Sequence, residues 1–140
     1  MKYRRYGNTL VVRVDIGERL MESLTEVCKK ENAMLGSISG LGAVSHVTYG
    51  YLDTASRTII KKEKSGDMEI TALIGSVTRL DGQPNFHLHI TLADSEQHAW
   101  GGHLFEAEVS VTAEVLITLL DGDPINRVFS PEAGINLMDL

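Results

Sequence analysis

Three of the five histidines in this chain lie close together in the sequence, at His87, His89 and His103. The first two belong to residues 85–94, where polar and apolar residues alternate as they do in a β-strand. Side chains two residues apart in a strand project from the same face, so both imidazoles share one side. Three neutral imidazoles that converge on one point can bind a transition metal, and the pattern predicts a zinc site with an open fourth position.

The third ligand depends on the glycine pair that precedes His103. Gly101 and Gly102 permit a tight turn, and we expect them to return the chain toward the histidine strand. The alternative is that His87 and His89 are half-buried polar residues that hydrogen-bond to nearby backbone, with no metal between them. The spacing alone leaves both interpretations open.

Cys28, His46 and His98 carry reactive groups but have no partner at ligand spacing. His98 lies in the polar loop 95–98, so we expect solvent around it. Cys28 lies beside apolar positions of a predicted helix, which favours a place in the core. A single cysteine cannot form an internal disulfide, in agreement with a reducing compartment.

Carboxylates can accept a hydrogen bond from the second nitrogen of a ligating histidine. Glu114 is the acid of most interest, because residues 111, 113, 115 and 117 form an apolar face of its predicted strand and leave it on the other face. There it would orient a ligand or act as general base on a metal-bound water; the alternative is a surface glutamate. Asp94 has the opposite parity to His87 and His89, so we expect it to cap the strand or hold the following loop.

The order of several short motifs resembles the plants and prokaryotes conserved (PPC) domain, and the resemblance covers nearly the whole chain. Each motif alone is weak evidence, but the order of the motifs along the chain is specific to the family. The motifs are Ile38-Ser39-Gly40-Leu41-Gly42-Ala43-Val44, Glu69-Ile70-Thr71-Ala72-Leu73-Ile74-Gly75, Gly82-Gln83-Pro84, His87-Leu88-His89, Leu92-Ala93-Asp94, Gly101-Gly102-His103-Leu104 and Thr112-Ala113-Glu114-Val115.

The resemblance implies an α+β domain with a mostly antiparallel sheet, one main helix near the N-terminus, and assembly as a homotrimer. It also implies a stand-alone prokaryotic type, often labelled as a predicted DNA-binding protein. The fold is similar to that of acetolactate decarboxylase, which holds zinc with three histidines, so His87, His89 and His103 are implied as ligands. Residues 95–100 depart from the family, whose members often have glycine there, and this loop is expected to differ in shape.

Local patterns predict the elements that position these residues. Apolar residues at helical spacing, Leu20, Leu24 and Val27, predict a helix over 17–30 that stops near Asn32. Leu10, Val12 and Val14 alternate with Val11 and Arg13, so their strand is expected to be buried on both faces. The full set of expected strands covers residues 3–6, 9–14, 34–39, 44–53, 58–64, 68–79, 85–94, 108–120 and, as an edge strand, 125–129. The Gly40-Leu41-Gly42 stretch ends the strand at 34–39 before the next one begins at residue 44.

Length and charge limit the class of protein. A chain of 140 residues fits one domain, residues 1–140. No apolar run approaches the ~20 residues of a membrane span, and no signal core follows the N-terminus, so we expect a cytoplasmic protein. The net charge of −6 counts against non-specific DNA binding. Basic residues occur in two local sets. A trimer would gather Lys2, Arg4, Arg5 and Arg13 onto one face, whereas Lys61, Lys62 and Lys64 are more typical of a solvated strand end.

Two functional classes remain. The first is a trimeric binding or regulatory module in which a metal supports structure or a small-molecule ligand. The second is a metal-dependent enzyme, a lyase or hydrolase, that acts on a small polar substrate. Fold similarity does not transfer chemistry, so the binding module is ranked first.

Overall fold

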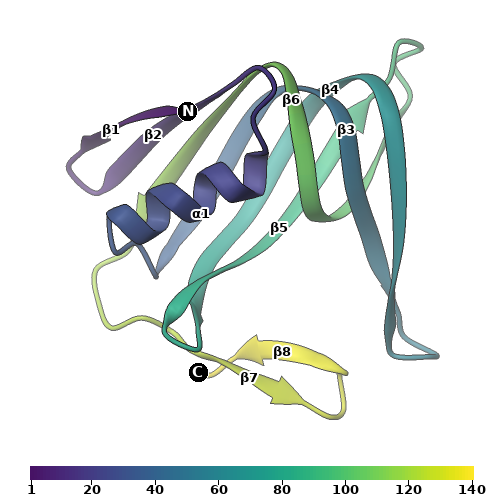
Figure 1. The fold of residues 1–140 in the computed structure, drawn as a ribbon. Coiled ribbons are helices and arrows are strands. Elements are labelled where there is room, and N and C mark those ends of the chain that lie inside the picture. The colour runs from purple at the N-terminus through teal and green to yellow at the C-terminus, as the bar shows by residue number, and fades with distance from the viewer.

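The computed structural model describes residues 1–140 and contains one helix and eight strands, labelled in Figure 1. Strand pairing is antiparallel in both sheets. The predicted α+β class, with one helix near the N-terminus, is therefore confirmed. In chain order the elements are β1 (Lys2–Tyr6), β2 (Thr9–Asp15), α1 (Leu20–Lys30), β3 (Gly36–Asp53), β4 (Thr58–Leu80), β5 (Gln83–Ala93), β6 (Ala99–Leu119), β7 (Arg127–Ser130) and β8 (Ile135–Met138).

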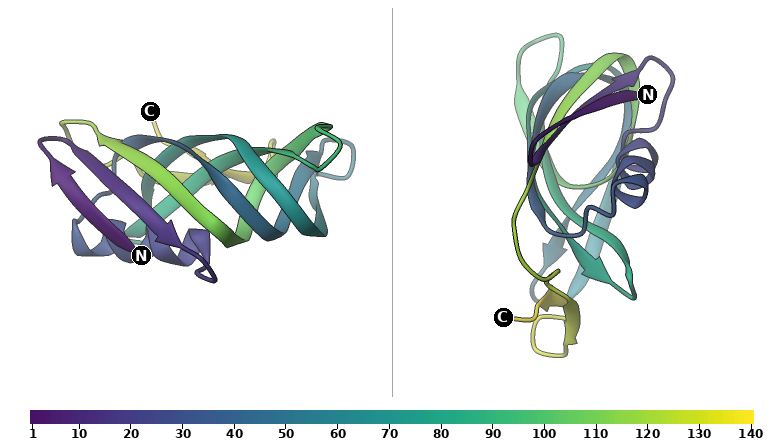
Figure 2. Two further views of the ribbon diagram at one scale, coloured as in Figure 1. Left: turned by 90° about the horizontal axis from the view of Figure 1, so that it is seen from above. Right: turned by 90° about the vertical axis from the view of Figure 1, so that its left-hand side faces the viewer.

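Strand β6 closes the main sheet. The six strands lie in the order β1-β2-β6-β3-β4-β5, and β6 pairs with β5 as well as with β2 and β3. This additional pairing curls the sheet into the ring that is visible in Figure 2 (right). Helix α1 crosses one side of the curled sheet (Figure 1), and apolar residues from both form a core of 24 buried residues. The β7–β8 hairpin is a separate two-stranded sheet at one end.

The N-terminal hairpin and the helix follow the sequence pattern. Strands β1 and β2 pair around Gly7, whose φ of 59° lies in the left-handed region that glycine adopts readily. Helix α1 begins at Leu20, later than predicted, and buries the expected stripe of Leu20, Leu24 and Val27. Asn32, the predicted stop, has a φ of 50°, which is typical of the residue after a helix C-cap. No helix in the structure is both long and apolar enough to cross a membrane.

Strand β2 is buried on one face only, so the prediction of burial on both faces is wrong. Leu10, Val12 and Val14 are fully buried, whereas Val11 is 40% exposed and Arg13 is also exposed. The core side of β2 faces α1 and the rest of the cluster, and its outer side has no covering layer within the chain.

Strands β3, β4 and β6 are longer than predicted. β3 continues through Gly40 and Gly42, where we expected an interruption, and β4 joins the predicted strands 58–64 and 68–79. The pairing of β3 with β4 shifts register at these glycines and again between Val44 and His46, so the irregularities are absorbed as bulges. The expected edge strand at 125–129 is instead β7, which pairs with β8 in the C-terminal tail.

Candidate metal centre

Strand β5 places His87 and His89 on one face, as predicted. Leu88, Ile90 and Leu92 occupy the other face and are at most 1% exposed. The two imidazole rings stand side by side with their centroids 5.4 Å apart. Burial of the alternate residues fixes the register, because a slip by one position would turn both histidines into the core.

His103 reaches the site through strand pairing and not through a glycine turn. It lies directly opposite His89 in the register of β5 and β6. Gly101 and Gly102 are within β6, so the prediction of a turn at this pair is wrong; the chain reverses earlier, in the loop between β5 and β6. A Cβ at Gly101 would lie 2.0 Å from the carbonyl oxygen of Ile90, and one at Gly102 would collide with β3. The glycine pair therefore lets β6 lie close to both neighbouring strands.

Asp94 holds the loop that reverses the chain, as expected from its parity. Its Oδ1 accepts hydrogen bonds from the backbone N–H groups of Glu96 and His98, each at 3.1 Å. The Nζ of Lys64 lies 3.6 Å from the other carboxylate oxygen. The side chain of His98 is 73% exposed, which confirms that it is solvated and separate from the three clustered histidines.

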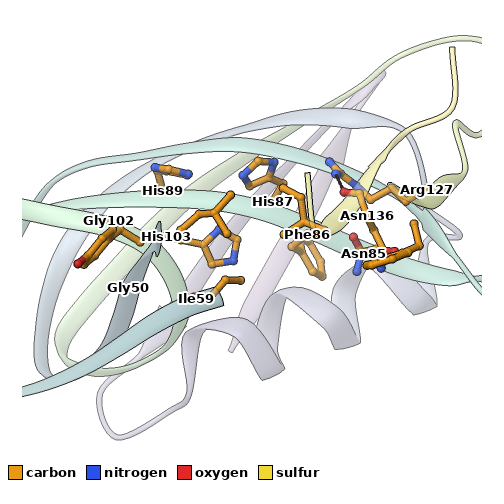
Figure 3. A pocket seen from close by; sticks show the side chains of 15 residues that line it. Gly50, Ile59, Asn85, Phe86, His87, His89, Gly102, His103, Arg127 and Asn136 are labelled. Atoms are coloured by element: carbon orange, nitrogen blue, oxygen red, sulfur yellow. Dashed lines mark hydrogen bonds between the residues drawn. The ribbon is translucent and has the colours of Figure 1, made fainter. Parts of the chain in front are cut away.

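The three histidines converge closely enough to share one metal ion. One ligand nitrogen from each lies within 4.8 Å of the others, and the ring centroid of His103 is 5.3 Å from that of His87 and 5.7 Å from that of His89. Nitrogen ligands of a tetrahedral zinc lie ~3.4 Å apart, given zinc–nitrogen bonds of ~2.1 Å. The three rings come from neighbouring positions of β5 and β6 (Figure 3), and the type and proximity of their nitrogen atoms fit a transition metal.

The surroundings of the histidines favour the neutral form that binds metal. Burial lowers the pKa of His103 to about 4, and the nearby charges of His87, His89, Lys61 and Arg127 act in the same direction. Burial is also the main cause of the lowered pKa of His87, with contributions from Arg127 and His89. At neutral pH both rings therefore offer a free nitrogen lone pair.

The histidines line a cavity of about 620 Å³. Its wall includes residues from β3, β4, β5 and β6 as well as from the C-terminal hairpin. It combines apolar side chains with the three imidazoles, two asparagines and one arginine, and it contains no carboxylate. The lining residues are Gly50, Tyr51, Leu52, Ile59, Asn85, Phe86, His87, His89, Gly102, His103, Arg127, Phe129, Gly134, Ile135 and Asn136.

Arg127 is the charged residue of the cavity wall and lies beside His87 (Figure 3). Its Nε donates to the hydroxyl of Thr78 at 2.8 Å, and its Nη1 donates to the carbonyl oxygen of Asn136 at 3.2 Å. Its Nη2 is buried and has no hydrogen-bond partner. Thr78 is itself 1% exposed and lies on β4, so this contact fixes the C-terminal hairpin against the main sheet.

Aromatic rings and lysines flank the site on the β4 side. The ring of Phe105 lies 4.9 Å from that of His103, and the Nζ of Lys61 lies 4.0 Å above the Phe105 ring. In a similar way Lys64 lies 4.3 Å above the ring of Trp100. Both lysine ammonium groups lie over aromatic faces; Lys61 adds positive charge near His103, whereas Lys64 lies beside the carboxylate of Asp94.

The other candidate residues lie away from the cluster. Glu114 is exposed on β6, opposite Arg13 of β2 and Leu41 of β3, and it does not line the cavity. The Nδ1 of His46 lies 2.9 Å from the hydroxyl oxygen of Ser65. Cys28 is fully buried, and burial raises the pKa of its thiol to about 12, which confirms its place in the core.

Sequence reasoning did not identify Arg127, Asn136 or the apolar wall of the cavity. Arg127 falls in a short predicted edge strand with no motif around it, and Asn136 falls in a tail that offered few apolar anchors. Their roles depend on the docking of β7 and β8 onto the sheet, which no local pattern indicates. Unlike these two residues, Phe86 could have been predicted from the sequence to line the site, because it directly precedes His87 on the same strand.

Comparisons with known proteins find the same fold elsewhere. A metal-containing protein from Archaeoglobus fulgidus has 32% sequence identity and a TM-score of 0.90, with 100% of each chain covered. A protein from Bacteroides thetaiotaomicron that is named as a candidate DNA-binding protein has 28% identity and a TM-score of 0.94, covering 99% of this chain and 96% of that one. The expected likeness to acetolactate decarboxylase extends to the fold: the Bacillus subtilis enzyme has 16% identity and a TM-score of 0.53, covering 83% of this chain and 52% of that one.

A curated relative and a family model complete the comparison. The bifunctional protein GlmU of Synechococcus sp. (strain JA-2-3B'a(2-13)) is 30% identical over 108 residues, which is 76% of this chain. This chain spans only 16% of the length of that relative. The model of the Plants and Prokaryotes Conserved (PCC) domain, the family also abbreviated PPC, matches residues 1–121. The chain therefore belongs to the Plants and Prokaryotes Conserved domain family.

Proposed function

We propose that this protein is a homotrimeric, metal-binding module in which His87, His89 and His103 hold one divalent transition metal, zinc, at the wall of a ligand cavity. The observation that carries the proposal is the convergence of the three imidazoles, with one nitrogen of each within 4.8 Å. The metal-containing relative from Archaeoglobus fulgidus supports it.

The chemistry of the donor set favours zinc or a similar ion. Three neutral imidazoles with no carboxylate suit zinc, copper, nickel and iron better than magnesium or calcium, which prefer oxygen ligands. When bound by three protein ligands, such an ion keeps a position open and acts there as a Lewis acid. The protein's part is to keep His87 and His103 neutral and to shape the cavity in front of the three imidazoles.

The test is elemental analysis of protein purified without an affinity tag. We expect about one transition-metal ion per chain in the wild type, and we expect its loss when His87, His89 and His103 are all changed to alanine. His98→Ala is the matched control, because His98 is exposed and outside the cluster, and it should retain the metal. Unchanged metal content in the triple variant, or no metal binding by the wild type at neutral pH, would contradict the proposal.

The outer face of the sheet supports self-association. Val11, Leu116, Ser39, Ile74 and His89 are successive cross-strand neighbours on β2, β6, β3, β4 and β5. Directly opposed residues point to the same side, and the three apolar members of this row are each at least 40% exposed. A second copy of the chain would bury such a surface, and the row ends at the metal centre.

Light scattering tests the trimer. We expect a mass near three times 15.4 kDa, and we expect Ile74→Lys to lower it, because a lysine there would place a charge in the contact. Ile16→Lys is the matched control: Ile16 is 72% exposed but lies between β2 and α1, away from the row. A monomer mass for dilute wild-type protein would refute the trimer.

A metal-dependent enzyme is the second candidate, and the cavity beside the histidines favours it. At about 620 Å³ the cavity has the size of typical small-molecule sites, and the open metal position would face it. In such an enzyme Glu114 would act as general base only if another copy of the chain brought it near the site, since it does not line this cavity. Conversion of a small hydroxy- or oxo-acid by the metal-loaded protein, followed by nuclear magnetic resonance and abolished by removal of the metal, would favour the enzyme over the binding module.

DNA binding is weakly supported, although a relative carries that description. Two of the four basic residues near the N-terminus already pair with carboxylates: Arg5 with Glu31 at 3.0 Å and Arg13 with Asp15 at 2.7 Å. The net charge of −6 repels a polyanion at long range. We therefore assign the cavity, and not a basic face, as the functional surface.

A further inference from the structure

We propose that the cavity binds a small organic carboxylate, whose carboxylate group is held between the metal and the guanidinium of Arg127. This inference rests on the proposed function and names the ligand class of the same site. It is carried by the charge balance of the cavity wall, the unmet hydrogen-bonding capacity of Arg127 and the apolar residues that surround both.

Positive charge in the cavity has no counterion within the chain. Three neutral imidazoles would leave the charge of a divalent ion uncompensated, and Arg127 adds another positive charge to the same wall. Lys61 adds a further positive charge beside the site, because its Nζ lies 4.0 Å from the centroid of the Phe105 ring, which itself lies 4.9 Å from the ring of His103. The cavity lining contains no aspartate or glutamate. Buried charges are rarely left without a partner, so the missing partner is an anion.

Arg127 has donors available for that anion. Both of its hydrogen bonds go to neutral oxygen atoms, those of Thr78 and Asn136, and Nη2 has no partner at all. Burial lowers the pKa of the guanidinium, but an arginine remains charged at neutral pH. A planar guanidinium matches a planar carboxylate and can donate two parallel hydrogen bonds to it. Because Nη2 is enclosed, a small rotation of the side chain toward the cavity accompanies binding.

The rest of the wall favours an organic anion over an inorganic one. Phe86, Phe129, Ile59 and Ile135 give the cavity an apolar portion that inorganic phosphate would leave in contact with water. Phe129 is 64% exposed in the chain alone and lines the cavity, so its ring is accessible to a ligand there. A carboxylate with a short branched apolar substituent would neutralise the positive charge of the cavity wall and would also fill the apolar portion of the cavity.

The experiment titrates 3-methylbutanoate into cobalt-substituted protein by calorimetry and visible spectroscopy. We expect binding that alters the cobalt spectrum, with 3-methylbutanamide and inorganic phosphate at least tenfold weaker. Arg127→Gln should weaken 3-methylbutanoate at least tenfold while metal content stays unchanged, and Arg127→Lys should fall between it and the wild type. Arg4→Gln is the matched control: Arg4 is exposed on β1, at the opposite edge of the sheet order from β5, and it does not line the cavity.

Several outcomes would overturn the inference. The first is that 3-methylbutanoate leaves the spectrum of the cobalt-loaded protein unchanged. The second is that Arg127→Gln binds 3-methylbutanoate as tightly as the wild type does. The third is that inorganic phosphate binds as tightly as 3-methylbutanoate. A loss of trimer mass in Arg127→Gln would assign the arginine to a subunit contact and would also overturn it. If Arg127→Gln does not fold, Phe129→Ala serves instead, since it removes an exposed part of the apolar wall and should weaken binding several-fold without affecting the metal.

A failure of the metal proposal can be distinguished from a failure of this one. If the wild type binds no metal, the proposed function fails, and the same titration on the metal-free protein then decides the subsite alone. Arg127-dependent binding of 3-methylbutanoate would support the subsite, and no binding would refute it.

Discussion

A methyl group at Gly101 should disrupt both the sheet and the metal centre. In Gly101→Ala the new Cβ would lie 2.0 Å from the carbonyl oxygen of Ile90 and 3.0 Å from the Cα of Thr91. Close carbon–oxygen contacts in sheets are ~3.3 Å, so β5 and β6 must separate by roughly 1 Å. Overpacking of this kind costs about 1–3 kcal/mol, and each of the two nearest ladder hydrogen bonds adds about 1 kcal/mol when lost. The expected loss is therefore about 3–5 kcal/mol.

Urea unfolding at one fixed protein concentration measures this loss. For a slope of ~2 kcal/mol per molar urea, the midpoint should fall by roughly 1.5–2.5 M. Gly7→Ala is the matched control, because Gly7 has a φ of 59° but nothing within 4 Å of the added methyl; it should cost only about 1–2 kcal/mol of left-handed strain. His103 is opposite His89 in the same ladder, so Gly101→Ala should also weaken metal binding and Gly7→Ala should not. A midpoint for Gly101→Ala no lower than that of Gly7→Ala, with full metal content, would refute the close-packing argument.

Two further predictions follow from charge. Burial lowers the pKa of His103 to about 4 from 6.5, so the unfolded metal-free chain takes up this proton at higher pH than the folded chain does. The stability contribution should be complete above about pH 6.5, decrease as the pH falls from about 6.5 to about 4, and level off below that. In His103→Asn the urea midpoint should change less between pH 7 and pH 4.5 than it does in the wild type. An equal change in both proteins would contradict the lowered pKa of His103. A labelled DNA duplex at about 150 mM salt should show no sub-micromolar binding, given the net charge of −6; tight, salt-sensitive binding that is lost in Arg4→Gln and Arg5→Gln would reverse this conclusion.

The sequence placed His87 and His89 on one face because strand periodicity is a local property, whereas His103 was added from the expected glycine turn and the family resemblance. His87 and His89 needed only the alternation of β5, in which Leu88 and Ile90 supply the buried face. The same reasoning found α1 from Leu20, Leu24 and Val27. In both cases the residues that decide the element are within a few positions of one another, so no knowledge of the tertiary structure was needed.

The glycine positions were harder to interpret than the apolar ones, because a residue without a side chain allows two different kinds of structure. Gly101 and Gly102 were expected to turn the chain, and Gly40 and Gly42 to interrupt a strand. In the structure the first pair allows β6 to approach its neighbours, and the second pair lies at a bulge within β3. A missing side chain permits either a turn or a close approach, and only the position of the neighbouring strand distinguishes the two.

The two halves of the cavity differ in how firmly they are held. All three histidines stand on β5 and β6, whose pairing also closes the main sheet, so moving a ligand would require breaking that ladder. Arg127 and Phe129 instead belong to the β7–β8 hairpin. Its hydrogen bonds to the main sheet are those of Arg79 with Ile125 and Asn126, of Arg127 with Thr78, and of Arg57 with Pro131. Few buried contacts allow local motion at low cost. The histidine half of the cavity is therefore preorganised, and the arginine half can adjust, so that the enclosed guanidinium nitrogen could reach the carboxylate of the proposed ligand.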